Sequence, residues 1–373
     1  MADSLAGRPV RVAHLTSVHP RTDTRVFLKE CRSLVQAGFE VFLIVADGRG
    51  SETREGVQIV DVGPRSGGRA GRALVTAGRV FAAARRLKAD IYHFHDPELL
   101  PWGVLLRCSG GKVVYDAHEH LSDDVHAKRY LPVALRPAVS LIAGSCELLA
   151  VRALSAVVAA TPYILERFRR RPALTAGVYN FPLAEELLRP RSWGARDAQA
   201  CFVGGIGYDR GIRELALAAT MCRSRIVVAG PLWDGLTPQS VLAIPGWDRI
   251  SYRGVLGRAE VADLMGASRV GIVTFLPNVG HVNALPNKLF EYMSAGIAVV
   301  ASDFPHWRDI VSARGCGLCV NPRDPAAIAA AVDRLAEDET FGAACGRNGA
   351  EAVAREYNWN TQAAKLVDLY RRL

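Results

Sequence analysis

Runs of hydrophobic residues alternate with stretches of helical periodicity along the first half of the chain. The apolar runs predict buried strands at residues 9–16, 40–46, 57–62, 90–94, 112–116 and 155–160, and the periodic stretches predict helices at 25–37, 71–88, 98–107 and 138–153. Because strands that alternate with helices pair in parallel, this half is expected to form a doubly wound α/β sheet. Such sheets bind ligands beyond the carboxyl ends of their strands, so the segments after the strands are the first place to look for a site.

The alternation pauses at residues 182–197, a charged and irregular stretch that we expect to be a linker. It then restarts, with strands expected at 200–203, 225–230, 249–253, 269–275 and 297–301, two helices within 324–355 and a last amphipathic helix at 358–373. The 373 residues fit two domains of roughly 150–200 residues. We therefore expect Rossmann-like domains at 1–181 and 198–357, with the helix at 358–373 packing back on the first domain.

The segment 281–297 (HVNALPNKLFEYMSAGI) carries the clearest local signal for ligand binding. Pro286 predicts the start of a helix, which leaves the backbone N–H groups of residues 285–288 free at the positive end of the helix dipole. Such an end favours a phosphate by roughly 0.3–2 kcal/mol. Lys288 adds a cation, and Glu291 falls one turn later, where a carboxylate could accept both hydroxyls of a ribose. An ordinary amphipathic helix with two surface charges would have the same spacing.

A glycine-rich turn follows the first strand of the second half. Gly204 and Gly205 come directly after the predicted strand, and Arg210 follows a few residues later. Glycines let the backbone approach a phosphate closely, and an arginine could clamp it. The pattern does not match a dinucleotide-binding fingerprint, so on its own it indicates only a phosphate-compatible turn.

Polar residues also gather after the predicted strands of the first half. They are His19, Asp23 and Arg25 after the first strand, His95 and Asp96 after the fourth, Asp116, His118, Glu119 and His120 after the fifth, and Thr161 after the sixth. Any one of them has an ordinary explanation, since Asp96 before Pro97 and Thr161 before Pro162 are good helix caps. Together, on one edge of a sheet, they predict a site.

Composition narrows the class of partner. The chain has 46 Lys and Arg against 37 Asp and Glu, a formal charge of +9, which favours anionic partners such as nucleotides or phospholipids. Nucleic acid is not expected, because the basic residues form no stripe interleaved with aromatic residues. Arginines within 129–136 and 167–171 flank an apolar stretch, which allows peripheral contact with an anionic membrane or simply forms a solvated basic face. Glu147 and Arg152 interrupt this stretch, so we do not expect it to span a bilayer.

Eight cysteines are spread through apolar contexts, as expected for reduced thiols in a cytoplasmic protein. Cys316 and Cys319 have the spacing of a redox or zinc pair, but the chain has no second pair. The N-terminus shows no charged and then apolar signal segment. We therefore expect a cytoplasmic enzyme, with any membrane contact made from the inner face.

Two stretches resemble the bacterial, retaining glycosyltransferases of family 4, which have the GT-B fold and use nucleotide-diphosphate sugars. Residues 202–211, from Phe202 to Gly211, are similar to the family's strand–glycine–basic–glycine turn, and residues 283–303 are similar to its donor-binding segment. The resemblance covers nearly the whole chain. It implies two Rossmann-like, doubly wound domains that face each other across a cleft, the first binding the acceptor and the second the nucleotide sugar.

The resemblance also implies roles for individual residues. The expected donor-binding residues are Gly204, Gly205, Arg210, Asn283, Ala284, Leu285, Pro286, Asn287, Lys288 and Glu291, with Glu291 on the ribose. Two positions depart from the family pattern: Asn283 replaces a glutamate that faces the donor sugar, and Gly205 replaces a frequent arginine. Lys288 or Arg25 could supply the missing cation.

In the first half, His118 resembles the histidine that borders the transferred sugar, and residues 93–100 resemble an acceptor-side loop. The expected catalytic groups are His118, Arg210 and Lys288, and the expected acceptor-binding residues are His19, Asp23, Arg25, His95, Asp96 and Glu119. No metal or other cofactor is expected, because cations and N–H dipoles can hold the leaving diphosphate and the chain has no Asp-x-Asp motif.

The implied reaction transfers a hexosyl or N-acetylhexosaminyl group from a nucleotide-diphosphate sugar to a hydroxyl of a small-molecule or lipid-linked acceptor, with a UDP-sugar favoured over a GDP-sugar. Two other functions fit parts of the sequence. His93, His95 and His118 could bind the zinc ion of a metal-dependent hydrolase, although His93 is expected inside a strand and the second half would then have no role. A non-catalytic nucleotide- or sugar-binding protein is the other alternative.

Overall fold

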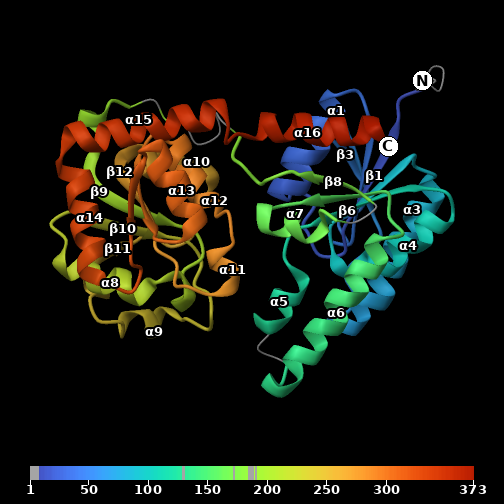
Figure 1. Ribbon diagram of the computed structural model, residues 1–373, viewed down its shortest axis with the longest axis horizontal. Helices are drawn as coiled ribbons and strands as arrows, with labels where there is room; N and C mark the ends of the chain where they lie inside the picture. The colour runs from blue at the N-terminus through green and yellow to red at the C-terminus, as the bar shows by residue number, and fades with distance from the viewer. Residues whose placement is uncertain (1–7, 128–130, 171–172, 184–188, 190) are drawn as a thin grey trace. The chain divides into compact units, whose positions relative to one another are not determined.

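The computed structural model describes residues 8–127, 131–170, 173–183, 189 and 191–373. The chain divides into two compact units (Figure 1), unit 1 with Met1–Asn180 and Asn360–Leu373, and unit 2 with Phe181–Trp359. The N-terminal unit was expected to end at residue 181, one residue later. Of the expected linker, residues 184–188 and 190 lie outside the described residues, and the remainder belongs to unit 2.

Unit 1 contains an eight-stranded sheet with the order β3-β4-β2-β1-β5-β6-β7-β8. Its strands are β1 (Arg11–Leu15), β2 (Glu40–Val45), β3 (Glu52–Arg54), β4 (Val57–Asp61), β5 (Ile91–Phe94), β6 (Lys112–Ala117), β7 (Ala156–Ala159) and β8 (Leu174–Gly177). All neighbours pair in parallel except β3, which pairs antiparallel with β4 at one edge. This order brings β1 and β5 together at the centre, although about 75 residues separate them along the chain.

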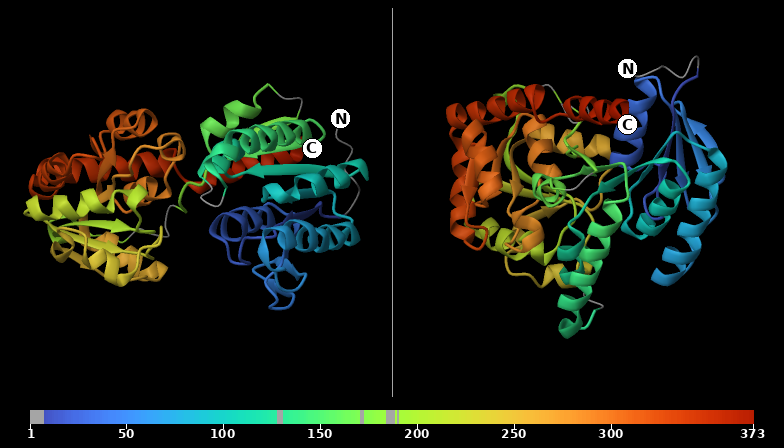
Figure 2. Two further views of the ribbon diagram at one scale, coloured as in Figure 1. Left: turned by 90° about the horizontal axis from the view of Figure 1, so that it is seen from below. Right: turned by 45° about the vertical axis from the view of Figure 1, so that its right-hand side comes forward.

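Helices cover both faces of the unit 1 sheet (Figure 2, left). They are the π-helix η1 (Thr24–Cys31), α1 (Arg32–Gln36), α2 (Gly68–Gly71), the π-helix η2 (Arg72–Thr76), α3 (Ala77–Leu87), η3 (Pro97–Leu99), α4 (Leu100–Cys108), α5 (Leu121–Ala127), η4 (Val133–Leu135), α6 (Arg136–Val151) and α7 (Pro162–Phe168). The expected helix at 25–37 is thus a π-helix that continues as an α-helix. A π-helix inside a helical run often marks a functional position.

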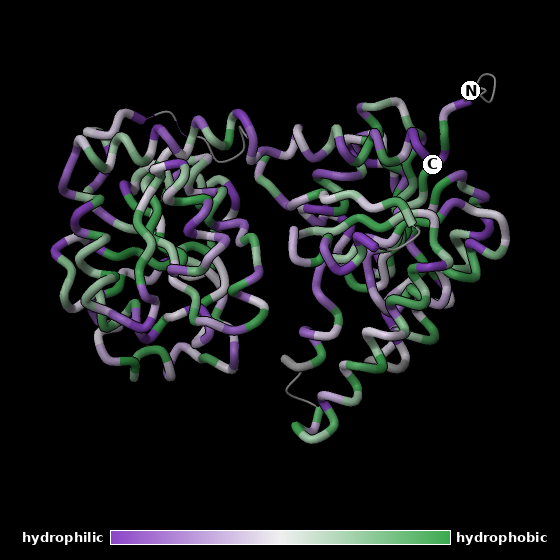
Figure 3. The backbone as a smooth tube through the Cα atoms, viewed as in Figure 1, coloured by the Kyte–Doolittle hydropathy of each residue, from purple (hydrophilic) through white to green (hydrophobic). Residues whose placement is uncertain are grey.

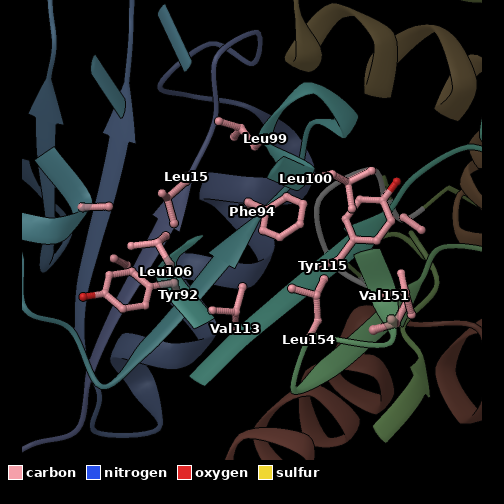
Figure 4. Close-up of a cluster of buried hydrophobic side chains, with 14 of the residues drawn as sticks. Leu15, Tyr92, Phe94, Leu99, Leu100, Leu106, Val113, Tyr115, Val151 and Leu154 are labelled. Atoms are coloured by element: carbon pink, nitrogen blue, oxygen red, sulfur yellow. The ribbon is translucent and has the colours of Figure 1, made fainter. Parts of the chain in front are cut away.

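The core of unit 1 is formed where β1, β5 and β6 meet α3 and α4. Figure 4 shows Leu15, Phe94, Leu100, Tyr115 and their neighbours packed in this cluster. Along the tube of Figure 3 the hydrophobic segments follow the strands, as expected for parallel strands that are covered on both faces. This rigid sheet positions the polar loops that follow the strands.

The C-terminal helix α16 (Trp359–Arg372) packs on unit 1. Leu366, Leu369 and Tyr370 are buried, and the Tyr370 ring meets Phe39 edge-on at 5.8 Å between centroids. The Tyr370 hydroxyl also reaches His93 Nδ1 at 2.6 Å. The last helix therefore joins the interior of the N-terminal unit.

Unit 2 contains a six-stranded, fully parallel sheet with the order β11-β10-β9-β12-β13-β14. Its strands are β9 (Asp197–Val203), β10 (Arg225–Ala229), β11 (Ile250–Tyr252), β12 (Ser268–Val273), β13 (Ala298–Ser302) and β14 (Gly317–Val320). Its helices are η5 (Trp193–Ala195), η6 (Tyr208–Arg210), α8 (Ile212–Met221), α9 (Pro238–Leu242), η7 (Trp247–Arg249), α10 (Arg258–Ala267), α11 (Val279–Val282), α12 (Asn287–Ser294), α13 (Pro305–Arg314), α14 (Pro325–Glu337) and α15 (Glu339–Arg355). Two doubly wound α/β units confirm the expected fold class.

The helix α12 begins and ends where the sequence predicts. Pro286 is its N-cap residue and Gly296 follows it with φ +67°, a left-handed conformation that suits glycine. Tyr292 is fully buried, and its hydroxyl accepts a hydrogen bond from the N–H of Val203 at 3.0 Å. This bond ties α12 directly to the end of β9, so the two segments expected to bind the donor are adjacent.

The sequence did not predict β3, β8 and β14, and all three are edge strands. They are short and none contains a fully buried residue, so none forms a continuous apolar run. Cys319 lies in β14, and all eight cysteines are free.

The helix α6 presents a largely exposed apolar surface. Among the described residues, Val133–Val151 is the one segment long and apolar enough to cross a membrane by length and composition alone, and little of it is buried. Glu147, expected to interrupt this stretch, lies on its buried side, where it bonds to Tyr115 and Arg167. It therefore leaves the exposed apolar side of α6 uninterrupted.

Candidate functional site

Two cations meet over one aromatic ring in unit 2. The guanidinium of Arg210 lies 5.0 Å from the centroid of Phe275, and the ammonium of Lys288 lies 5.6 Å from the same centroid. Within the part of the chain that the structure describes, neither cation forms an ion pair or a hydrogen bond. Two unpaired cations this close repel each other, so the arrangement favours an anion between them.

Burial disfavours the charged form of Lys288. Desolvation, with the nearby charge of Arg210, lowers the pKa of Lys288 from 10.5 to about 8. Burial likewise lowers the pKa of Arg210. Both shifts show that these side chains lack an acidic partner strong enough to offset their desolvation.

The glycine-rich turn after β9 fits around these cations. A Cβ on Gly204, which has φ +116°, would lie 2.4 Å from Lys288 Nζ, so a side chain there would displace the lysine ammonium. A Cβ on Gly205 would lie 2.6 Å from the indole ring of Trp233, which in turn stacks on Arg210 at 4.4 Å. Trp233 therefore fills the space where the family pattern often has an arginine.

Backbone N–H groups in the same two segments lack partners among the described residues. The helix α12 has no side-chain cap, and the N–H groups of Asn287 and Lys288 bond to none of the described residues. The N–H of Gly205 is also without a partner among them. Unpaired N–H groups at a helix N-terminus, beside two cations, are suited to bind phosphate.

The remaining donor-side residues lie around α12. Glu291 Oε1 accepts a bond from Arg258 at 3.1 Å, so the expected ribose-binding carboxylate is held by an arginine and is partly exposed. Asn283, expected to face the donor sugar, instead donates its amide to the carbonyl of Val279 at 3.0 Å. The carbonyl of Ala284 accepts a bond from the indole of Trp307, which holds the loop of Leu285 and Pro286.

In unit 1, Asp116 connects several of the expected acceptor residues. Its carboxylate receives Arg25 at 2.8 and 2.9 Å, His118 Nε2 at 2.8 Å and His95 Nδ1 at 3.2 Å. Burial opposes its ionisation, but Arg25 and His118 outweigh burial and hold the pKa of Asp116 well below its usual range. The ionised Asp116 fixes the ring of His118, whose side chain is 21% exposed.

The expected acceptor residues separate into surface and interior groups. Arg25, His95 and Asp96 are 5%, 2% and 3% exposed, which corrects the expectation that they line a pocket for an acceptor. Arg25 is held by Asp116 and the carbonyl of Val178, so it does not supply the cation missing from the donor side.

Asp96 shapes the loop after β1. Its carboxylate accepts bonds from Thr16 and from the backbone and hydroxyl of Ser17, and it pairs with His19 at 3.0 Å. Burial opposes protonation of His19, but Asp96 outweighs it and raises the pKa of His19. Asp96 thus orders the loop instead of capping η3.

The other polar residues have separate positions. Asp23, which was expected to bind the acceptor, caps η1, and Thr161 caps α7 as expected. Glu119 is exposed beside His118. His120 turns away to Arg167 and Asp123, so it cannot join His118 at a common metal.

Two family models match the chain. The model described as Glycosyltransferase Family 4 matches residues 24–177, and the model described as Glycosyl transferases group 1 matches residues 198–338. The chain belongs to these glycosyltransferases. The two matches correspond to unit 1 and unit 2, so both halves of the family 4 architecture are accounted for.

Curated relatives and solved structures agree with this assignment. A phosphatidyl-myo-inositol mannosyltransferase of Mycobacterium leprae is 33% identical over 115 residues, which are 31% of this chain and 30% of that protein. The chain spans 30% to 50% of the length of the curated relatives it matches.

Among solved structures, sucrose-phosphate synthase from Thermosynechococcus elongatus is 18% identical with a TM-score of 0.76, covering 98% of this chain and 99% of that one. Anabaena HepE in complex with UDP is 14% identical with a TM-score of 0.71, covering 98% and 100%. At these identities the likeness shows the shared fold.

Sequence reasoning missed three residues of this family 4 glycosyltransferase that touch the expected site residues. Trp233 stacks on Arg210, Arg258 pairs with Glu291, and Asp116 holds His118. The glycine at 205 was the available signal for Trp233, because an absent side chain leaves space for a neighbour. Nothing in the sequence pattern predicted the partner of Glu291.

Proposed function

We propose that the chain is a retaining glycosyltransferase that moves a sugar from a nucleotide-diphosphate sugar to a hydroxyl acceptor. A UDP-sugar is the favoured donor, and the transferred group is a hexosyl or N-acetylhexosaminyl group. In this proposal unit 2 binds the donor and unit 1 binds the acceptor. The eight free cysteines support a reducing location such as the cytoplasm, where nucleotide sugars are available.

One observation carries the proposal: Arg210 and Lys288 meet over Phe275, both are unpaired within the described residues, and Lys288 belongs to the uncapped first turn of α12. A diphosphate has the charge and the acceptor oxygens that this arrangement requires. The HepE structure in complex with UDP has the same fold, which supports a uridine nucleotide. Glu291, one turn after Lys288, would accept the ribose hydroxyls.

The chemistry follows from the charge of the leaving group. As the bond between the anomeric carbon and the phosphate oxygen breaks, negative charge develops on the diphosphate. Two cations and oriented N–H groups stabilise that charge without a metal ion. The acceptor oxygen forms the new bond on the same face of the sugar, and its proton passes to the departing phosphate oxygen. The products are the glycoside and the nucleoside diphosphate.

His118 would hold the transferred sugar, and Asp116 would orient the imidazole ring of His118. The Asp116 carboxylate accepts the bond from His118 Nε2 at 2.8 Å, so the other ring nitrogen is the one directed toward the sugar. Asp116 acts through His118 and is therefore a positioning residue. His19 and Glu119 are the partly or fully exposed residues nearby that remain suited to acceptor contact.

We further propose that the acceptor is lipid-linked and that α6 rests on the membrane surface. The exposed apolar residues of η4 and α6 are Val133, Leu135, Leu141, Ile142 and Leu149. The expected basic groups contribute less than the sequence suggested, because Arg167 is bound to Glu147 and Arg169 pairs with Glu166. Lys128, Arg129 and Arg171 lie outside the described residues.

Flotation with vesicles that contain anionic lipid tests whether α6 binds the membrane surface, and loss of binding in Leu141→Ser with Ile142→Ser is the expected result.

Sugar transfer can be tested directly with labelled nucleotide sugars. We expect turnover of a UDP-sugar with an acceptor extract, and a loss of about 10²–10³ in Arg210→Ala and in Glu291→Ala. Arg213→Ala is the matched control, because Arg213, three residues after Arg210, is an exposed arginine that stacks on Tyr208. Near-normal transfer in both site variants would remove the donor assignment.

The same assay separates the two alternatives. A metal-dependent hydrolase would lose activity in a strong chelator and would release sugar without an acceptor. A binding protein would bind UDP without turnover of any donor. Transfer that persists in the chelator supports the proposal against both.

A further inference from the structure

Four ionisable side chains meet in the interior of unit 1, below the residues proposed to contact substrate. They are His14 on β1, Glu30 on η1, His93 on β5 and His95 just after β5, and we call them the buried cluster. All four are buried, with His14, Glu30 and His93 fully so. No step of the proposed transfer uses His14, Glu30 or His93.

The fold explains why these side chains converge. His14 and His93 are direct neighbours in the register of β1 and β5, so their side chains lie side by side on one face of the sheet. His95 follows two residues after His93 and returns to that face. The π-helix η1 covers the same face and brings Glu30 over the three imidazoles.

The four ligand atoms lie within 4.8 Å of one another, close enough to surround one metal ion. Glu30 Oε2 lies 3.8 Å from His14 Nδ1, 3.9 Å from His93 Nδ1 and 3.9 Å from His95 Nε2. If all six edges had this length, the centre would lie about 2.4 Å from each corner, and a small inward movement of the side chains would reach the roughly 2.0–2.2 Å of zinc bonds to nitrogen and oxygen. His14 Nδ1 and His95 Nε2 are closer, at 2.9 Å, and share a proton that a metal ion would replace.

The groups behind two of the imidazoles have the pattern of a metal site. His95 presents Nε2 to the cluster while its Nδ1 bonds to the carboxylate of Asp116 at 3.2 Å. His14 presents Nδ1 while its Nε2 lies 3.4 Å from the hydroxyl of Tyr370. Such outer partners fix the tautomer and the ring orientation of metal-binding histidines.

The buried carboxyl group of Glu30 also lacks a full set of partners among the described residues. Neither carboxylate oxygen of Glu30 accepts a hydrogen bond from a described residue, although Arg25 Nε lies 3.1 Å from Oε1. Arg25 is shared with Asp116, so one guanidinium faces two buried carboxyl groups. Either a proton or a cation must complete this site.

We propose that the buried cluster is a structural zinc site. Three imidazoles and one carboxylate are ligands that zinc accepts, and four protein ligands leave no open position for substrate. The ion would bind as unit 1 folds and would hold β1, β5 and η1 together. Its role is separate from the diphosphate, which needs no metal in the proposed transfer.

Metal binding would also change a contact of the C-terminal helix α16. The Tyr370 hydroxyl and His93 Nδ1 are hydrogen-bonded at 2.6 Å, and zinc on the same nitrogen displaces that bond. The surroundings of the Tyr370 ring therefore change when zinc binds. Tyrosine absorption provides a second readout that does not depend on enzyme activity.

The test uses the full chain with any affinity tag removed, refolded with excess zinc and then dialysed. We expect about one zinc per chain by plasma mass spectrometry, and the intense visible bands of tetrahedral cobalt when cobalt replaces zinc. Zinc below about 0.1 per chain would overturn the proposal, and a proton on Glu30 would then complete the site instead. These measurements need no variant, so they decide the matter even where a variant fails to fold.

Variants then locate the ion. Asp116→Asn removes an outer partner of His95 and should lower zinc affinity roughly 10–100-fold. Glu30→Gln removes a ligand and should lower zinc affinity by at least as much. His306→Asn, which removes an exposed histidine of unit 2, is the matched control and should retain one zinc. His118→Asn should also retain it. Loss of zinc in His118→Asn would place the ion at the neighbouring group of His95, Asp116 and His118 and overturn the assignment.

Discussion

Lys288 offers the sharpest test of the donor site, because its charge depends on pH within a measurable range. Its ammonium packs against the backbone of Gly204 and over Phe275, and its pKa is lowered to about 8. A diphosphate beside the ammonium favours the charged form. Binding of a nucleotide above about pH 8 must therefore be accompanied by uptake of a proton.

The magnitude follows from that pKa. With a pKa of about 8, roughly nine in ten Lys288 side chains are charged at about pH 7 and roughly one in ten at about pH 9. If only the charged form binds the diphosphate, the Kd for UDP rises roughly tenfold over this interval. Lys288→Met removes a charged hydrogen bond worth about 1.5–3 kcal/mol, which weakens binding about 10–100-fold at pH 7 and leaves it nearly independent of pH.

The stability of the ligand-free protein should change in the opposite direction. Between about pH 8 and pH 10.5 the unfolded chain holds more protons on this lysine than the folded chain does. The cost of burying the charged Lys288 is therefore present below about pH 8 and is relieved as the pH rises toward 10.5. Urea unfolding with and without UDP would show the two opposite trends.

Isothermal titration calorimetry with UDP, in two buffers of different ionisation enthalpy, measures both the affinity and the protons taken up. Arg213→Ala is again the control and should keep the full pH dependence. A Kd for UDP that stays constant between about pH 7 and about pH 9 in the unmodified protein would refute the reasoning. An unchanged pH dependence in Lys288→Met would assign the effect to another group.

Three further predictions concern single side chains. Gly211→Ala should lower the free energy of unfolding, measured in urea, by at least about 2 kcal/mol, because φ is +74° and a Cβ would lie 2.2 Å from the carbonyl oxygen of Thr274. Gly67→Ala is the control and should be nearly neutral, because a Cβ on Gly67 would have no atom within 4 Å. Asp116→Asn should cost about 3–5 kcal/mol, because it removes the closer of the two buried carboxylates that face Arg25, and thermal unfolding measures this. Glu291→Gln should weaken UDP binding less than Glu291→Ala, since an amide still accepts one hydroxyl bond, and equal losses would argue against a ribose contact.

Local patterns in the sequence determined much of the fold. The central strands β1, β2, β5, β6, β9 and β12 lie within about three residues of their predicted bounds, because strands buried on both faces must be continuously apolar. The start of α12 after Pro286 and the glycine turn at Gly204 were also predictable, since both depend on backbone conformations that few residues adopt. The edge strands β3, β8 and β14 lack this signal and were missed.

Only the tertiary structure decided how the polar residues are shared between sites. The sequence placed Arg25, His95 and Asp96 at the rim of the sheet, but their burial depends on partners such as Asp116 that lie far away along the chain. The buried cluster exists because β1 pairs with β5 in the register that sets His14 beside His93. Trp233 reaches Arg210 for a similar reason, since β10 lies beside β9 in the sheet. Periodicity reports which residues are buried, whereas strand order determines which buried residues meet.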